Sequence, residues 1–204
     1  MIRMRLHICL AVLSLALAAC VAPGGGTDRV RILGGTMTIA APQGYCVDPG
    51  SRRDTGGGAF VLFGSCAAIS GDPSAAKPPY PAMLSATVGP TTPEPLRETF
   101  PGFEKFFQSS AGRAALARSG APQDVAILRV VRSDGLLLLK IRDRSRQQGT
   151  PVSETYWRAI TGLGGRITAL SVLPLRGARL SDAQQIRLLH DFDAAIRAAN
   201  RTGL

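Results

Sequence analysis

The chain has 204 residues, 45% of them hydrophobic and 19% charged, and a formal charge of +10 at neutral pH. This length suits a single folded domain of ordinary size. The positive charge favours anionic neighbours, but no nucleic-acid-binding motif accompanies it, so nucleic acid is excluded as an expected partner.

The first 19 residues have the parts of a secretory signal peptide. Arg3 and Arg5 form a basic head, and the apolar stretch from Ile8 to Ala19 spans 12 residues. A membrane-spanning helix needs roughly 20. The stretch ends in Leu17-Ala18-Ala19-Cys20, which resembles the lipobox of bacterial lipoproteins. The alternative is an ordinary signal peptide whose cleavage site includes a cysteine.

The lipobox resemblance implies a location for the protein. In that family the Cys sulfur, here that of Cys20, receives a diacylglycerol, the preceding peptide is removed, and the new amino terminus is acylated. Several acyl chains anchor a protein stably to a membrane. An Asp directly after the lipidated Cys favours the inner membrane in that family, and this chain has Val21. The resemblance therefore implies a lipid anchor in the outer membrane, with the body facing the periplasm.

The cysteine content favours one disulfide. Of four cysteines, Cys9 would leave with the signal peptide and Cys20 would carry lipid. Cys46 and Cys66 remain as an even pair in an oxidising compartment, where a disulfide is expected and a free nucleophilic thiol is the alternative. The mature chain has a single histidine, His190. A metal site is therefore not expected.

Residues 20–35 are interpreted as the lipidated Cys and a flexible glycine-rich tether, and residues 36–204 as one domain. About 14 flexible residues give an r.m.s. reach of roughly 20 Å, which would bring the body to its home membrane. Strands are predicted over 36–48 and 59–69, joined by a polar glycine loop. Placing Cys46 opposite Cys66 would centre the turn at Gly56.

Residues 73–101 contain eight prolines and are interpreted as extended connecting chain. A helix is predicted next, with Leu96, Phe100, Phe103 and Phe107 on one buried face. Pro101 and Gly102 are expected to break or kink it. A second short helix is predicted over 110–118.

The remaining elements complete the predicted fold. Asp134-Gly135 predicts a tight β-hairpin, and a further hairpin is expected to turn at 162–165. Ser181 and Gln184 form a capping box that begins an amphipathic helix of about 20 residues. Together these elements predict an α+β fold, in which an antiparallel sheet built from hairpins is covered by helices, with a long C-terminal amphipathic helix.

The order of elements resembles the α/β sandwich of the PsbP-like extrinsic photosystem proteins. Those proteins also open with a strand followed by Pro-x-Gly-aromatic, here Pro42-Gln43-Gly44-Tyr45, and close with a long helix. Their usual Trp after the Gly is Tyr here, and the cysteine pair is not part of their pattern. Many members are non-catalytic adaptors, so the resemblance implies no reaction.

No established catalytic or cofactor motif occurs in the chain. It lacks a G-x-S-x-G nucleophile elbow, a P-loop, a G-x-G-x-x-G fingerprint and an H-E-x-x-H helix. Accordingly no catalytic residue and no cofactor are predicted.

One charged pattern predicts a binding surface. Four cations alternate with other residues along a predicted strand, which would place them on one face at intervals of roughly 7 Å: Lys140, Arg142, Arg144 and Arg146. They are the anion-binding candidates, and a solvated strand edge is the alternative interpretation.

These inferences predict a non-catalytic, lipid-anchored periplasmic binding or assembly module of the bacterial envelope. Its expected partners are the membrane that holds its lipid and an anionic lipid, an envelope polymer or another envelope protein. The alternative is a periplasmic hydrolase acting on envelope polymers, with a spatially assembled pair of catalytic groups.

Overall fold

A computed structural model of the chain describes residues 26–92, 95–145 and 151–201. The predicted signal peptide, Cys20 and Arg146 lie outside these ranges. One eight-stranded antiparallel sheet dominates, in the order β3-β5-β6-β10-β9-β8-β7, with β4 beside β5. The strands are β3 (Tyr45–Val47), β4 (Arg53–Asp54), β5 (Ala59–Ser65), β6 (Ala82–Thr91), β7 (Val125–Ser133), β8 (Leu136–Asp143), β9 (Thr155–Leu163) and β10 (Arg166–Pro174).

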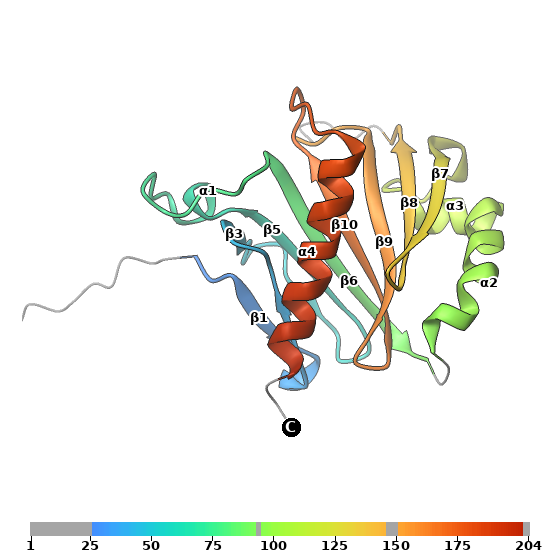
Figure 1. Cartoon of the computed structure of the whole chain (residues 1–204), viewed down its shortest axis with the longest axis horizontal. Helices are drawn as coiled ribbons and strands as arrows, with labels where there is room; N and C mark the ends of the chain where they lie inside the picture. Colours follow the sequence, from blue (N-terminus) through green and yellow to red (C-terminus); the bar gives the residue numbers. More distant parts are fainter. Residues whose placement is uncertain (1–25, 93–94, 146–150, 202–204) are drawn as a thin grey trace, which may run out of the picture.

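Helices cover both faces of this sheet (Figure 1). The near face is crossed by α4 (Asp182–Arg201), beside a separate hairpin of β1 (Arg29–Ile32) and β2 (Met37–Ala40) that is joined by the short helix Leu33–Gly35. The other helices are α1 (Cys66–Ser70), α2 (Leu96–Gln108), α3 (Ser110–Leu116) and a single 3-10 turn, Pro122–Asp124. The predicted α+β class is confirmed.

The alternation of side chains in β8 and β9 builds two cores. Leu136 and Leu138 pack with α4, whereas Leu137 and Leu139 pack with α2 and α3. Successive side chains of a strand point to opposite faces of the sheet. A strand that is covered on both faces therefore has a continuous run of apolar residues in its sequence. Trp157 is fully buried on the α4 side, which makes it a core residue.

The C-terminal helix begins and ends as its sequence predicts. Ser181 Oγ accepts from the backbone N–H of Gln184, and Gln184 Oε1 accepts from the backbone N–H of Ser181, which completes the capping box. At the other end Asn200 exchanges two hydrogen bonds with the backbone of Thr38 in β2. The helix therefore holds the β1–β2 hairpin against the sheet.

The predicted tether of residues 20–35 is too long. Residues 29–32 form β1, which pairs with β2, and the backbone N–H of Val47 donates to Thr27 O. Alternating Arg29-Val30-Arg31-Ile32 is a strand pattern, and the adjacent glycine triplet obscured it. The folded body therefore begins by Thr27. This position is ten residues before Met37, where β2 starts, and so lies closer to Cys20.

The interpretation of residues 73–101 as connecting chain is also wrong in its centre. Residues 82–91 form β6, which lies between β5 and β10 in the sheet. Prolines flank this strand, and Pro90 lies near its end, where fewer backbone N–H groups need partners. The prolines therefore bound a central strand.

The register of the first hairpin differs from the prediction by two residues. Cys46 lies opposite Gly64 rather than Cys66, and β5 ends at Ser65, so Cys66 begins α1. The other two predicted hairpins are present, turning at Asp134–Gly135 and at Gly164–Gly165, where all four residues have positive φ.

Candidate functional site

A row of cations lies on the α4 side of the sheet at its β8 and β7 end. Lys140 and Arg142 are half-buried, and Arg144 follows the strand and is exposed. The intervening Ile141, Asp143 and Ser145 are buried, so the predicted alternation is present over the described positions. Arg146 lies outside the described residues.

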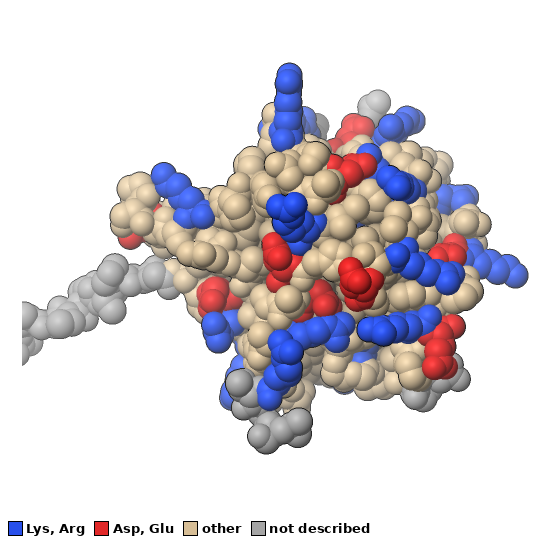
Figure 2. All heavy atoms as spheres, in the orientation of Figure 1, with Lys and Arg blue, Asp and Glu red and all other residues tan. Residues whose placement is uncertain are grey.

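Sequence reasoning missed a fourth cation, Arg129 of β7. It is exposed and lies directly opposite Lys140 in the sheet, so the two side chains share a face. A β-bulge between Ile127 and Arg129 shifts the alternation of β7, which hides this placement from the sequence pattern. We call Arg129, Lys140, Arg142 and Arg144 the cationic strip. Figure 2 shows Lys and Arg side chains gathered beside the upper part of α4, over β8 and β7.

Part of this charge is compensated. Lys140 Nζ lies 2.8 Å from Asp182 Oδ2, and Trp157 Nε1 donates to Asp182 Oδ1 at 3.0 Å. The hydrogen bond from Lys140 lowers the pKa of Asp182 against the effect of desolvation, and the charge of Arg129 adds to the lowering. The guanidinium groups of the other strip residues have no ion-pair partner among the described residues: Arg129, Arg142 and Arg144.

A groove of about 610 Å³ adjoins the strip at the N-terminal end of α4. Its lining comes from the end of β8, from the chain before β9 and from the loop between β10 and α4, and includes Lys140, Glu154, Asp182 and Gln185. This volume is in the range of small-molecule sites. The groove and the strip therefore form one continuous candidate site, joined at Lys140.

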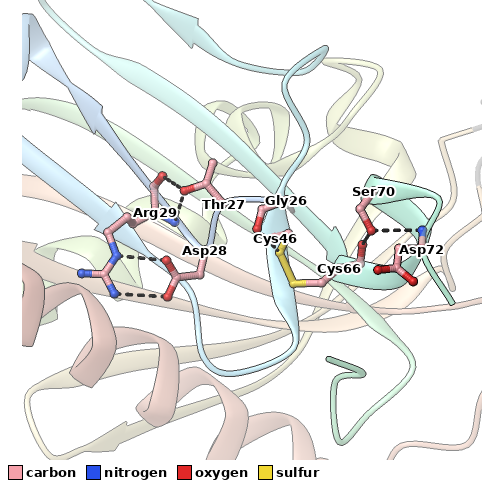
Figure 3. Close-up of a disulfide and its surroundings, with 8 residues drawn as sticks. All are labelled: Gly26, Thr27, Asp28, Arg29, Cys46, Cys66, Ser70 and Asp72. Atoms are coloured by element: carbon pink, nitrogen blue, oxygen red, sulfur yellow. Dashed lines mark hydrogen bonds and ion pairs between the residues drawn. A yellow bond between two sulfur atoms is a disulfide. The ribbon is translucent and has the colours of Figure 1, made fainter. Parts of the chain in front are cut away.

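The predicted disulfide between Cys46 and Cys66 is confirmed, with a Cα–Cα distance of 4.7 Å (Figure 3). It joins β3 to α1, and Gly26 packs against it closely enough that an added Cβ would lie 3.0 Å from Cys46 Cβ. The disulfide therefore lies where the folded body begins. With both sulfurs in this bond, neither cysteine is a free nucleophile.

The end of β8 carries a second polar cluster on the opposite face. Asp143 is fully buried and accepts hydrogen bonds from the backbone N–H of Ser145 and from both the backbone and the side chain of Arg118. Ser119 bonds Ser145 and Asp124. These donors and acceptors are matched to one another, so the cluster fastens the segment after α3 to β8.

The predicted apolar face of α2 is confirmed: Leu96, Phe100 and Phe107 are core residues, and Phe103 is half-buried against them. Phe106, which lies outside that face, is 42% exposed. Phe106 and Phe103 border a shallow apolar hollow on α2.

Across residues 26–92, 95–145 and 151–201, no group of three His, Cys, Asp or Glu side chains is placed to hold a metal ion. None of the helices in these ranges has the length and apolarity to cross a bilayer. No family model, curated protein or solved structure matches this chain. The site is therefore interpreted from its own geometry and charge.

Proposed function

We propose that the protein is a lipid-anchored periplasmic binding or assembly module that engages an anionic polymer of the bacterial envelope through its cationic strip. The anchor is inferred from Leu17-Ala18-Ala19-Cys20, and the disulfide between Cys46 and Cys66 is in keeping with an oxidising compartment. The observation that carries the proposal is the clustering of four cations beside a groove, three of them without an ion-pair partner in the described chain.

The position of the strip favours a polymer over the home membrane as its ligand. The body begins beside β3, whereas Lys140 and Arg142 lie on β8, five strand positions away in the sheet order. At the usual strand spacing this separation is about 24 Å. The six residue steps from Cys20 to Gly26 span at most about 20 Å. A lipid anchor at Cys20 would therefore hold the body near β3, with the strip toward the other end of the sheet.

The test compares two variants of equal charge, each made in a mature chain that carries Cys20→Ala. The first replaces Arg129, Arg142 and Arg144 with Gln. The second replaces Arg53, Lys77 and Lys105, which are exposed and lie outside the strip and groove. Each substitution set removes three positive charges, so the pair separates the strip from net charge.

Binding to immobilised polygalacturonate is measured at low salt. A cation near an anionic surface contributes about 1 kcal/mol, so loss of three should weaken binding roughly a hundredfold. The control variant should bind within about threefold of the parent, because its three charges lie outside the strip and the groove. Equal losses in the two variants would show that only net charge matters, and the strip would then have no specific role.

A further inference from the structure

The groove contains a buried hydrogen-bond acceptor without a donor. Gln185 is 5% exposed, and its Oε1 accepts no hydrogen bond from the described residues. Its Nε2 donates to Leu180 O at 3.1 Å, so flipping the amide would set two acceptors against each other. The orientation of Gln185 is therefore fixed, with Oε1 as the open acceptor.

Such an acceptor points to a ligand that donates. Buried side-chain oxygens are almost always paired in proteins, and Gln185 is one of the residues that line the groove. The donor must be a hydroxyl, an amide or an amine. The nearby lining residues Val152, Pro174 and Leu180 are apolar, and Val152 and Pro174 are buried.

The charge at the mouth of the groove adds a second requirement. Lys140 Nζ uses one of its protons on Asp182 and retains two for a ligand. Arg142 follows two residues along β8, and Arg129 lies opposite Lys140. Glu154 and Asp182 also line the groove, but the cations on its Lys140 side favour a ligand that carries a negative charge.

We infer that this groove binds an acidic sugar unit of the anionic polymer, with a hydroxyl donating to Gln185 Oε1 and the acidic group next to Lys140. This inference rests on the proposed function and specifies its ligand. A bilayer surface supplies anionic groups but is flat, whereas a sugar unit of a chain can enter a groove. The remaining negative charges of the polymer then lie along the strip.

The experiment titrates the mature chain carrying Cys20→Ala, which needs no detergent and has no acyl chains to insert into vesicles, with trigalacturonic acid. Gln185→Met removes the acceptor at similar volume. Thr168→Val is the matched control, because Thr168 Oγ1 is also buried without a partner but does not line the groove. Maltotriose and phosphatidylglycerol vesicles serve as a neutral sugar and an anionic lipid.

The wild type should bind trigalacturonic acid, and Gln185→Met should bind about five- to tenfold more weakly, as expected for one lost hydrogen bond. Thr168→Val should match the wild type. In case Gln185→Met folds poorly, the side-chain amide signal of Gln185 is followed by NMR in the wild type. It should shift with trigalacturonic acid and stay unchanged with maltotriose or vesicles.

Unchanged affinity in a folded Gln185→Met variant, or an amide signal that does not move, would overturn this inference. Equal binding of maltotriose would show that the ligand need not be acidic. Binding of vesicles alone would show that the groove takes a lipid and not a sugar. These failures are distinct from failure of the proposed function, which is decided by the variant lacking Arg129, Arg142 and Arg144. If that variant loses polygalacturonate while Gln185→Met retains trigalacturonic acid, only the groove assignment is wrong.

Discussion

The carboxylate of Asp143 stabilises the end of β8 from the face of the sheet opposite the cationic strip. It is fully buried beneath the strip, and Arg118 Nε lies 2.8 Å from Oδ2. Burial opposes ionisation, but hydrogen bonds from Ser145 and Arg118 outweigh it and hold the pKa of Asp143 below its ordinary value. The ionised form is therefore the one that fastens the end of β8.

We predict that Asp143→Asn lowers the free energy of unfolding by about 2–3 kcal/mol at pH 7, because charged hydrogen bonds are lost. A group with a lowered folded pKa stabilises above its unfolded pKa, and this contribution is lost as the pH falls through the folded value. The difference between wild type and variant should therefore shrink on acidification below about pH 4. Urea unfolding across this pH range measures it.

Asp191→Asn is the control for this prediction. Asp191 is exposed on α4, so its replacement changes net charge equally and should alter stability by less than about 0.5 kcal/mol. A difference between Asp143→Asn and wild type that stays constant with pH would contradict a role for the ionised carboxylate.

The candidate site could be predicted from the sequence only where it depends on local alternation. Period-two patterning predicts the placement of Lys140 and Arg142 because both lie on one regular strand. Asp182, which pairs with Lys140, lies 42 residues further on, and such a pairing depends on tertiary packing. The sequence does not predict Gln185 as a site residue, because a polar residue at the start of an amphipathic helix is expected to be exposed.

Among the structural elements, the disulfide has the most specific role. It connects β3 to α1 across a sequence separation of 20 residues and contacts the first described residue, Gly26. We predict that replacing both Cys46 and Cys66 with Ser lowers the free energy of unfolding by about 3 kcal/mol in the chain-entropy account. Denaturant unfolding of the oxidised wild type and the double variant measures this.

Thiol alkylation supplies the independent check of the disulfide. Without reductant, neither Cys46 nor Cys66 should be labelled in native protein purified from cells. Rapid labelling of either residue in the native protein, or equal stability of the double variant, would show that the bond does not form in the cell.

The elements predicted best are those with a local chemical signal. Asp134 and Gly135 both adopt positive φ, as a two-residue hairpin requires, and the capping box marks the start of α4. β6 was missed because the prolines around it dominate the local pattern, and β1 because glycines precede it. The register of β3 on β5 depends on α1 taking Cys66 out of the strand, which alternation alone does not predict.

At the scale of the whole molecule, the proposed attachment and the proposed binding surface lie toward different ends of the sheet. Figure 1 shows the chain entering at the β1 and β3 end of the sheet, while β8 and β7 lie toward the other end. A body attached near its disulfide would hold the cationic strip away from its anchor. This geometry suits a module that captures a polymer extending through the periplasm.

Lipidation is the prediction on which this orientation depends. We predict that mass spectrometry of the mature protein finds an acylated Cys20 at the amino terminus, and that the protein sediments with outer membranes. Cys20→Ala should yield soluble or uncleaved protein without acyl groups, because the lipid acceptor is lost. An unmodified Cys20 in the mature wild type would exclude the anchor.

The mature chain has three lysines, Lys77, Lys105 and Lys140, and only the last lies in the strip. This permits the most direct test of where an anionic polymer binds. Polygalacturonate activated as its N-hydroxysuccinimide ester is added to the lipidated protein at low salt, and the modified lysines are mapped by mass spectrometry. The account predicts that Lys140 reacts first although its side chain is only 26% exposed, and that high salt abolishes this preference. Faster reaction of Lys77 and Lys105 at low salt would contradict binding at the strip.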